Sequence, residues 1–329
     1  MGKLKILRLF VILVVIGTST SAIGKMKVAM VLDVGGSLNN SYNRSAVEGA
    51  LLVKDRLGLE IQTGEPPDQT SFEPMLRYYA KKKYDLIIAI GVGQRDALKV
   101  VAAHFPEIRF AIVDAVVNAK NVTSIQFLEQ EGAYLMGALA ALSTKTHMIG
   151  FIGGMDIPLI RRFEKGYYSG AKSIDPKIKI LSNFVDITPD AWSNPVKAKE
   201  IALDQYDAGV DIVFAVAGGS GLGVFDAAEE RKRLVIGVDT NQNGLKPGFV
   251  LTSLVKKIDT ALLMLCGDLI SNSMKGKTLR YGLANRGIDY SVDSYNRSLL
   301  SPLVKKRVDK IKADISLGEI RIPGYYDTK

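Results

Sequence analysis

Cysteine, histidine and tryptophan are almost absent from this sequence of 329 residues. The single cysteine, Cys266, excludes an intramolecular disulfide, so an apolar core must stabilise the fold. His104 and His147 are the only histidines, and they have neither the spacing of zinc ligands nor the acidic partner of a catalytic triad. The chain also lacks the G-x-S-x-G and G-x-x-x-x-G-K-[ST] motifs. We therefore expect no metal site, no cofactor and no catalytic residues.

Long apolar runs are missing as well, apart from a short one at the N-terminus. Three basic residues among the first eight precede the apolar run 9–16, and small residues follow from 17 to 22. A membrane span needs about 20 apolar residues, so this run is too short for an anchor and is typical of a signal peptide. We expect residues 1–22 to be removed by cleavage near Ala22.

Acidic residues are fewer than basic ones. The formal net charge is +9, and removing the three basic residues of the signal peptide, which contains no Asp or Glu, leaves +6. The basic runs 81–83 and 305–307 have the character of solvated helix ends. A nucleic-acid surface would combine a basic stripe with interleaved aromatic residues, and since no such stripe is present, we expect no nucleic-acid partner.

Short apolar runs rich in β-formers alternate with helical patterns of ten or more residues, which is typical of parallel βαβ units. Residues 85–93, DLIIAIGVG, are echoed by residues 211–219, DIVFAVAGG, and each segment is a buried strand that runs into glycines and then a helix. The repeat predicts two lobes of the same topology. The clearest expected strands are 27–33, 59–63, 85–90, 109–114, 147–153 and 177–185, and the clearest helices are 71–83, 94–103 and 158–173.

The connection between the lobes is predicted to be a hinge of several strands. No linker rich in Pro, Gly or Ser separates the two halves, so a single tether is not expected. Candidate crossings lie near residues 126–132, 254–257 and 290–298. The expected division is residues 26–130 plus about 256–292 for lobe 1, and 131–255 plus about 293–329 for lobe 2.

Ligands of open parallel sheets bind beyond the carboxyl ends of the strands, so the residues that follow each strand are the candidate site. After the first strand, Asp33 offers two acceptor oxygens, Tyr42 offers a flat face for stacking, and Asn43 adds an amide. Two glycines between them let the backbone approach a ligand closely. The alternative interpretation is an ordinary turn in which a polar residue at 40–43 caps the next helix.

Charged residues end three further strands. Asp114 can accept a hydrogen bond from a base N–H or a hydroxyl, or it can cap a loop. Asp239 and Lys256 suit a ribose, because the sugar hydroxyls donate to a carboxylate while an ammonium donates to the remaining oxygens. Either residue could instead be half of a structural ion pair.

A glycine-rich turn, residues 218–223, follows the expected strand 212–216 and opens a helix. It exposes the backbone N–H groups of Gly218 and Gly219 to an anion or a hydroxyl. Its spacing is G-x-G-x-G and not G-x-G-x-x-G, so we expect no dinucleotide. Trp192, the only tryptophan, lies in a polar loop and is either a packed lid or a stacking platform.

The chain resembles the basic membrane protein family of ABC transporter substrate-binding proteins, which includes purine nucleoside receptors. The similarity runs from about residue 26 to at least residue 260 with its motifs in the family's order. These motifs are KVAMVLDVGG at 27–36, SYN at 41–43, FAIVDAVV at 110–117, QEGAYLMG at 130–137, GGMDIP at 153–158, AGGSGLGV at 217–224, GVDTNQ at 237–242 and LTSLVK at 251–256.

This resemblance implies a type I periplasmic-binding-protein fold, an α/β architecture in which two Rossmann-like lobes with parallel sheets are joined by a multi-strand hinge. It also implies a monomer that captures a purine nucleoside and delivers it to an ABC transporter permease in the inner membrane. The alternatives are riboflavin, a sugar or a signalling molecule held by the same clamp, or a secreted nucleoside-processing enzyme.

The resemblance also implies the ligand contacts. Tyr42 matches the aromatic residue that stacks on the base, with Asn43 beside it. The opposite stacking face matches Trp192, and Phe184 is the alternative. The matched polar contacts are Asp33, Asp114, Asp239, Lys256 and the backbone of Gly218 and Gly219.

Four positions depart from the family pattern and bear on ligand choice. The family usually has acidic residues in place of Asn39 and Asn40, Phe in place of Tyr42, and Asp in place of Asn194. The cysteine that carries a lipid in many members is also missing after the signal peptide. We therefore expect a freely diffusing periplasmic protein.

Overall fold

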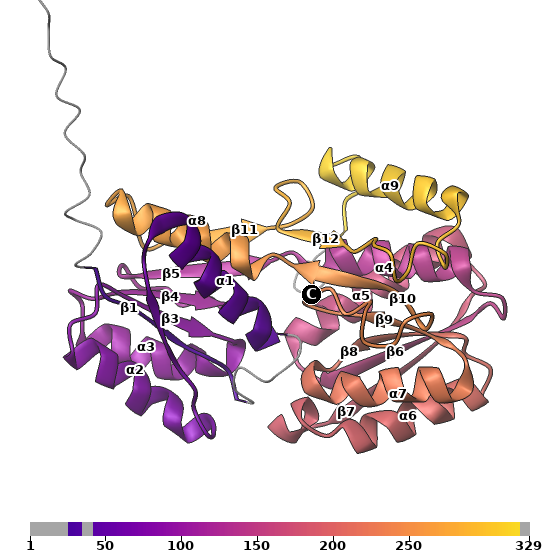
Figure 1. Cartoon of the computed structure of the whole chain (residues 1–329), viewed down its shortest axis with the longest axis horizontal. Helices are drawn as coiled ribbons and strands as arrows, with labels where there is room; N and C mark the ends of the chain where they lie inside the picture. The colour runs from indigo at the N-terminus through magenta and orange to yellow at the C-terminus, as the bar shows by residue number, and fades with distance from the viewer. Residues whose placement is uncertain (1–25, 35–41, 323–329) are drawn as a thin grey trace, which may run out of the picture.

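The structure is a computed structural model that describes residues 26–34 and 42–322, and this part of the chain forms two α/β lobes (Figure 1). The predicted signal peptide, 1–22, and the departures at Asn39 and Asn40 lie outside the described residues. None of the helices in the described part has the length and apolar character that a membrane crossing requires.

The first sheet is parallel throughout. Its inner strands are continuous runs of buried apolar residues, as expected for a sheet that is covered on both faces. Helices α2 (Phe72–Lys81) and α3 (Arg95–His104) cover one face, and α1 (Tyr42–Leu57) and α8 (Ile258–Ile270) cover the other (Figure 1). The strand order is β11 (Thr278–Tyr281), β5 (Val122–Phe127), β4 (Arg109–Val113), β3 (Leu86–Ile90), β1 (Val28–Val31) and β2 (Ile61–Gly64).

The second sheet repeats this order with one edge strand reversed, since β12 runs antiparallel to β10. Helices α4 (Glu129–Ser143) and α5 (Pro158–Ile174) pair on one face, and α6 (Pro195–Asp207) and α7 (Gly221–Arg231) pair on the other, while α9 (Pro302–Ser316) packs outside α4 (Figure 1). The strand order is β12 (Ile288–Tyr290), β10 (Val250–Lys256), β9 (Leu234–Gly237), β8 (Ile212–Val216), β6 (Met148–Met155) and β7 (Lys179–Asp186). The sequence repeat at 85–93 and 211–219 therefore marks β3 and β8, which occupy the same place in their sheets.

The chain passes between the two sheets three times among the described residues. Two passages, after β5 and after β10, fall in the windows that the sequence indicated. The third lies at 282–287, before β12, and not at 290–298 as expected. Tyr290 is already paired with Leu254 of β10, so the chain has reached the second sheet by this point. The short strands β11 and β12 lack long apolar runs, which is why sequence patterning located this passage poorly.

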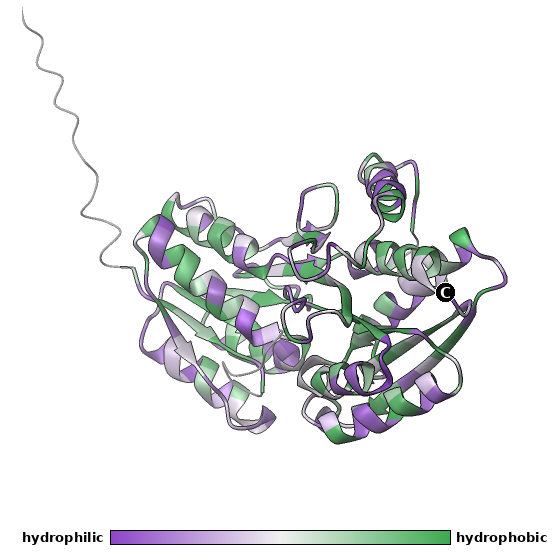
Figure 2. Cartoon of the chain, turned by 45° about the vertical axis from the view of Figure 1, so that its right-hand side comes forward, coloured by the Kyte–Doolittle hydropathy of each residue, from purple (hydrophilic) through white to green (hydrophobic). Residues whose placement is uncertain are grey.

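One apolar core extends through both lobes. It includes buried residues of β1 and β3 in the first sheet and of β6 and β8 in the second. Figure 2 shows hydrophobic residues concentrated on the strands and hydrophilic residues on the outward faces of the helices. Two smaller cores lie under α2 and α3 and under α6 and α7. The carboxyl ends of both sheets are thereby held facing one another.

Candidate functional site

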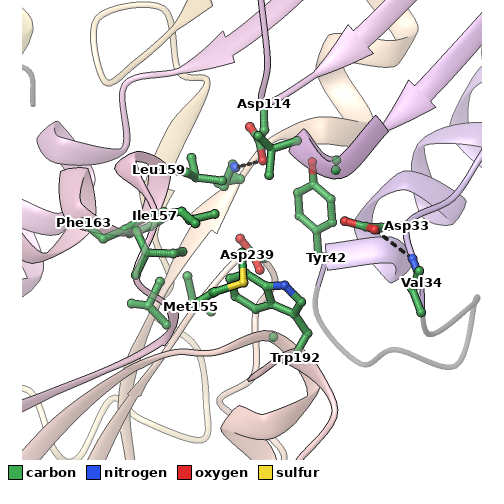
Figure 3. A pocket seen from close by; sticks show the side chains of 18 of the residues that line it. Asp33, Val34, Tyr42, Asp114, Met155, Ile157, Leu159, Phe163, Trp192 and Asp239 are labelled. Atoms are coloured by element: carbon green, nitrogen blue, oxygen red, sulfur yellow. Dashed lines mark hydrogen bonds and ion pairs between the residues drawn. The ribbon is translucent and has the colours of Figure 1, made fainter. Parts of the chain in front are cut away.

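A pocket lies between the lobes, at the carboxyl ends of strands from both sheets (Figure 3). It holds about 850 Å³ of empty space, counting the part that opens to solvent. Of the nine residues predicted from the sequence, seven line it: Asp33, Tyr42, Asp114, Trp192, Gly218, Asp239 and Lys256.

Asp114 and Asp239 lie just beyond β4 and β9, which are third from the corresponding edge in each sheet. Both residues adopt the left-handed backbone conformation, with φ of 67° and 66°. Among non-glycine residues, Asp and Asn adopt this conformation most readily, and it recurs at ligand sites where the surrounding structure holds it. In each lobe, the left-handed backbone conformation thus directs an acidic side chain into the pocket (Figure 3).

Lys256 is the cation of the pocket, and it is almost completely buried. Its Nζ lies 2.5 Å from Asp114 Oδ2. The other oxygen, Asp114 Oδ1, and the hydroxyl of Tyr42 are buried. Burial and the neighbouring Asp114 raise the pKa of this hydroxyl, but neither atom makes a hydrogen bond of good geometry with a described residue. An unsatisfied buried polar group costs about 1–3 kcal/mol, so these two atoms are suited to a ligand that supplies the missing hydrogen bonds.

Two carboxyl groups of the pocket titrate near neutral pH. Burial raises the pKa of Asp33 to about 6, with Asp114 adding to the shift and the backbone N–H of Val34 opposing it. Burial also raises the pKa of Asp239 to about 6, although Lys256 opposes the shift. Binding of a hydroxyl donor to either carboxylate is therefore expected to depend on pH.

Asn43 does not line the pocket, in contrast to the prediction of a direct contact. Its amide group brackets the backbone of Asp33 instead: Oδ1 accepts from the Asp33 N–H at 3.1 Å, and Nδ2 donates to the Asp33 carbonyl at 2.8 Å. This clamp ties the start of α1 to the end of β1. It fixes the place of Asp33 and, through the helix, that of Tyr42.

The two aromatic residues of the pocket come from opposite lobes. Tyr42 begins α1, and Trp192 ends a short 3₁₀ helix, η4 (Pro189–Trp192). The indole packs against Gly154, where an added Cβ would lie 2.3 Å from a ring carbon. Phe184, the alternative to Trp192, does not line the pocket. Its ring packs against Phe151, and the guanidinium of Arg161 lies over it at 4.4 Å from the ring centre.

The glycine-rich turn both lines the pocket and supports the loop that contains Trp192. Gly218, with φ of 55°, lines the pocket, but Gly219 does not. A Cβ on Gly219 would approach the carbonyl oxygen of Trp192 to 2.9 Å. Ser220 in the same turn accepts from the backbone N–H of Asn194 at 2.7 Å. The turn therefore fixes the loop that carries the indole.

Comparison with known proteins identifies the class to which this architecture belongs. A family model described as ABC transporter substrate-binding protein PnrA-like matches residues 26–325. The chain belongs to this family. It is a substrate-binding protein of an ABC transporter, and the family is one of extracytoplasmic solute-binding proteins, not of enzymes.

Two relatives and one solved structure illustrate the match. The chain is 35% identical to the ABC transporter nucleoside-binding protein BmpA of Lactococcus lactis, over 93% of this chain and 92% of that protein. It is 31% identical to basic membrane protein A of Borreliella afzelii, over 93% and 94%. The crystal structure of an ABC transporter solute-binding protein from Aeropyrum pernix K1 superposes with a TM-score of 0.82 at 26% identity, covering 92% of this chain and 95% of that one. The resemblance to the basic membrane protein family and the type I fold predicted from it are confirmed.

Sequence reasoning missed the apolar wall of this substrate-binding protein. The wall comes from the ends of β6, β8 and β9 and from the first turns of α5 in lobe 2. Its composition is that of an ordinary core, so no polar signal marked it. The motif GGMDIP at 153–158 was noted, but its apolar members were not assigned to the site. The wall residues are Met155, Ile157, Leu159, Ile160, Phe163, Val216 and Val238.

The buried carboxylate of Glu129 was also missed. It lies at the start of α4, where its Oε1 is 3.5 Å from Lys256 Nζ and its Oε2 accepts from Arg162 Nε at 2.9 Å. In the sequence this residue is a Glu near a predicted crossing, and nothing in its spacing indicates a contact with Lys256. Among residues 26–34 and 42–322, no group of three acidic, His or Cys side chains is placed to hold a metal ion.

Proposed function

We propose that this protein captures a purine nucleoside between its two lobes and delivers it to the permease of its transporter. The observation that carries the proposal is the composition of one pocket. Carboxylates from equivalent strand ends of both lobes, a buried lysine and two aromatic side chains all line it. A nucleoside offers matching chemistry, with a flat base for the aromatic groups and hydroxyls for the carboxylates and the ammonium.

The base lies between Tyr42 and Trp192 in this proposal. Stacking of a base on an aromatic side chain contributes about 1–3 kcal/mol. Asp114, through its unpaired Oδ1, accepts from an N–H on the edge of the base. Asp239 and Lys256 hold the ribose, and the apolar wall of lobe 2 covers the remaining surface of the ligand. The nucleoside-binding relative from Lactococcus lactis supports this assignment.

Capture requires contacts from both lobes at once. Tyr42 and Asp114 come from lobe 1, whereas Trp192 and Asp239 come from lobe 2. A ligand that contacts both sides favours the closed arrangement over open ones, because it gains its full set of contacts only when the lobes meet. The permease would then recognise the closed form. We propose the lobes as residues 26–128 with 257–287, and 129–256 with 288–322.

The setting of this capture is proposed to be the periplasm, with the mature protein a freely diffusing monomer. The signal peptide predicted at 1–22 and the absence of any cysteine other than Cys266 support this view. Fractionation of the native host tests it, because a lipid-anchored protein would sediment with membranes. Size-exclusion chromatography with light scattering tests the oligomeric state.

Fluorescence titration tests the nucleoside proposal directly. Trp192 is the only tryptophan and lines the pocket, so tryptophan emission reports on this site. We expect inosine, guanosine or adenosine to change the emission saturably, with calorimetry giving the same Kd, and riboflavin and ribose to bind far more weakly. Tighter binding of riboflavin or ribose would contradict the proposal. Release of hypoxanthine from inosine would contradict a role limited to binding.

A further inference from the structure

A buried network of charges extends from the pocket into the crossings between the lobes. Glu129 is fully buried and begins α4, immediately after the chain leaves β5 of lobe 1. It does not line the pocket, yet it contacts Lys256, which does. Lys256 ends β10, immediately before the chain returns to lobe 1. Two crossings are thus joined by one ion pair.

Lys256 is shared between two carboxylates. Its Nζ lies 2.5 Å from Asp114 Oδ2 and 3.5 Å from Glu129 Oε1. It also lies 4.9 Å from the centre of the Phe127 ring and 5.3 Å from that of Tyr42, so two aromatic rings lie beside the ammonium. Burial acts to lower the pKa of Lys256, but the carboxylates of Asp114, Glu129 and Asp239 together raise it by more. The pKa is therefore above its ordinary value, and the ammonium stays charged.

Arg162 completes the network from the far side. Its Nε donates to Glu129 Oε2 at 2.9 Å, and its side chain is mostly buried between α4 and α5. Burial raises the pKa of Glu129, and the cations Arg162 and Lys256 oppose that shift. Arg162 therefore favours the ionised form of a carboxylate that would otherwise be costly to bury.

We propose that Glu129 is a positioning residue for ligand binding: it holds Lys256 between two carboxylates, so that Asp114 keeps one oxygen free for the ligand. This inference rests on the proposed function, since it concerns the same pocket. Without the charge of Glu129, Lys256 has Asp114 as its one close carboxylate. It would then move toward both Asp114 oxygens and compete with the ligand for them.

The variant E129Q tests the inference, because it keeps the shape of the side chain and removes its charge. We expect nucleoside affinity, measured by Trp192 fluorescence with inosine, to fall about tenfold, within the range of coupling between contacting groups. The matched control is E131Q, two residues further along α4, whose carboxylate accepts from the Leu283 N–H outside the pocket. It should leave the affinity unchanged. An unchanged affinity in E129Q would overturn the inference.

A double-mutant cycle with D114N separates positioning from a general structural effect. If Glu129 acts through Lys256 on Asp114, then E129Q costs little further affinity once Asp114 has lost its charge. An equal loss in both backgrounds would overturn the inference. The pH profile gives a second readout: Asp239 faces Lys256, Asp114 and Glu129, and Glu129 contributes to its raised pKa. The midpoint of binding should therefore move to lower pH in E129Q, and an unmoved midpoint would reduce Glu129 to a structural role.

The variant E129Q/R162M keeps the test valid if E129Q alone folds poorly. Removing both charges of a buried pair avoids leaving Arg162 buried opposite a neutral side chain, which is a usual cause of instability. If the double variant is folded and still binds weakly, Glu129 acts through Lys256 as proposed. Wild-type affinity in the double variant would show that Glu129 serves only to satisfy Arg162, and would overturn the inference. The wild-type titration tests the nucleoside itself, and the variant-to-wild-type ratio tests Glu129 with whichever ligand of the panel binds.

Discussion

The two lobes have the same strand order but furnish the pocket with different chemistry. Lobe 1 supplies mainly polar groups, with Asp33 and Asp114 at strand ends and Tyr42 at the start of a helix. Lobe 2 supplies Asp239, Trp192 and, at the end of β10, Lys256 on a largely apolar surface. The strand ends are alike because the topology fixes them, whereas the loops and helix starts beyond them differ. A repeated scaffold thus places the site, and the loops decide what it binds.

This contrast predicts which lobe sets specificity and which supplies burial. Hydrogen bonds from lobe 1 select a ligand that carries the right donors, since a buried acceptor left unpaired costs free energy. Any flat ligand that covers the apolar wall of lobe 2 gains binding free energy, because apolar surface is removed from water. Substitutions in lobe 1 should therefore change both affinity and selectivity, and substitutions in lobe 2 should change affinity more uniformly.

The largest loss of affinity is expected from D114N in lobe 1. Asn tolerates the left-handed conformation at this position, and Glu129 remains as a partner for Lys256, so the fold should persist. Losing a charged acceptor for a base N–H should weaken nucleoside binding by about 100-fold, since hydrogen bonds to charged groups contribute about 1.5–3 kcal/mol. Calorimetry with inosine, guanosine and adenosine measures it. If D114N lost the same affinity for all three nucleosides, lobe 1 would not set the specificity.

A smaller loss is expected from W192A in lobe 2. Removing one stacking face should weaken binding by about ten- to hundred-fold, and similarly for each purine nucleoside. Calorimetry is the appropriate measurement because the variant has no tryptophan. F184L is the matched control, since Phe184 lies outside the pocket, and it should bind like the wild type. If F184L weakens binding more than W192A does, then Phe184 and not Trp192 is the second stacking residue.

Lowering the pH tests both lobes together. Asp33 of lobe 1 and Asp239 of lobe 2 each have a pKa raised to about 6, chiefly by burial. A ligand hydroxyl donates to the ionised carboxylate, so affinity should fall as pH drops from 7.5 to 5. The expected loss is about tenfold for each carboxylate that must be ionised. D239N should remove one of the two contributions, and an unaltered pH profile in this variant would show that Asp239 does not contact the ligand.

Sequence reasoning placed the charged residues well because their positions follow from topology. Asp114 and Asp239 follow buried strands and Lys256 ends one, and parallel strands bring their carboxyl ends to one edge. Asn43 and Gly219 were assigned to the ligand, but the structure uses them to hold Asp33 and Trp192. Adjacency in sequence could not distinguish a residue that faces the pocket from one that supports its neighbour.

Long-range contacts explain the remaining failures. Glu129 and Lys256 are 127 positions apart, and their contact depends on how two crossings pack. The passage at 282–287 has no hydrophobic period, because β11 and β12 are short edge strands. Neither feature leaves a local pattern in the chain. Both features belong to the hinge between the lobes, where the structure depends on long-range packing more than on local sequence propensity.

The smallest expected effect is on stability, in the unliganded variant D239N. The pKa of Asp239 is raised in the folded protein relative to its ordinary value, so the folded state binds more protons than the unfolded state between about pH 4 and 6. Stability is therefore lost as pH rises through this window, and the ionised carboxylate remains destabilising at pH 7.5. D239N should raise the free energy of unfolding at pH 7.5 by about 1 kcal/mol, after the lost attraction to Lys256 is counted. The gain should shrink at pH 4.5, which urea unfolding at both pH values would measure. If D239N is less stable than the wild type at pH 7.5, Asp239 stabilises the fold as a partner of Lys256 and is not a carboxylate held ready for a ligand.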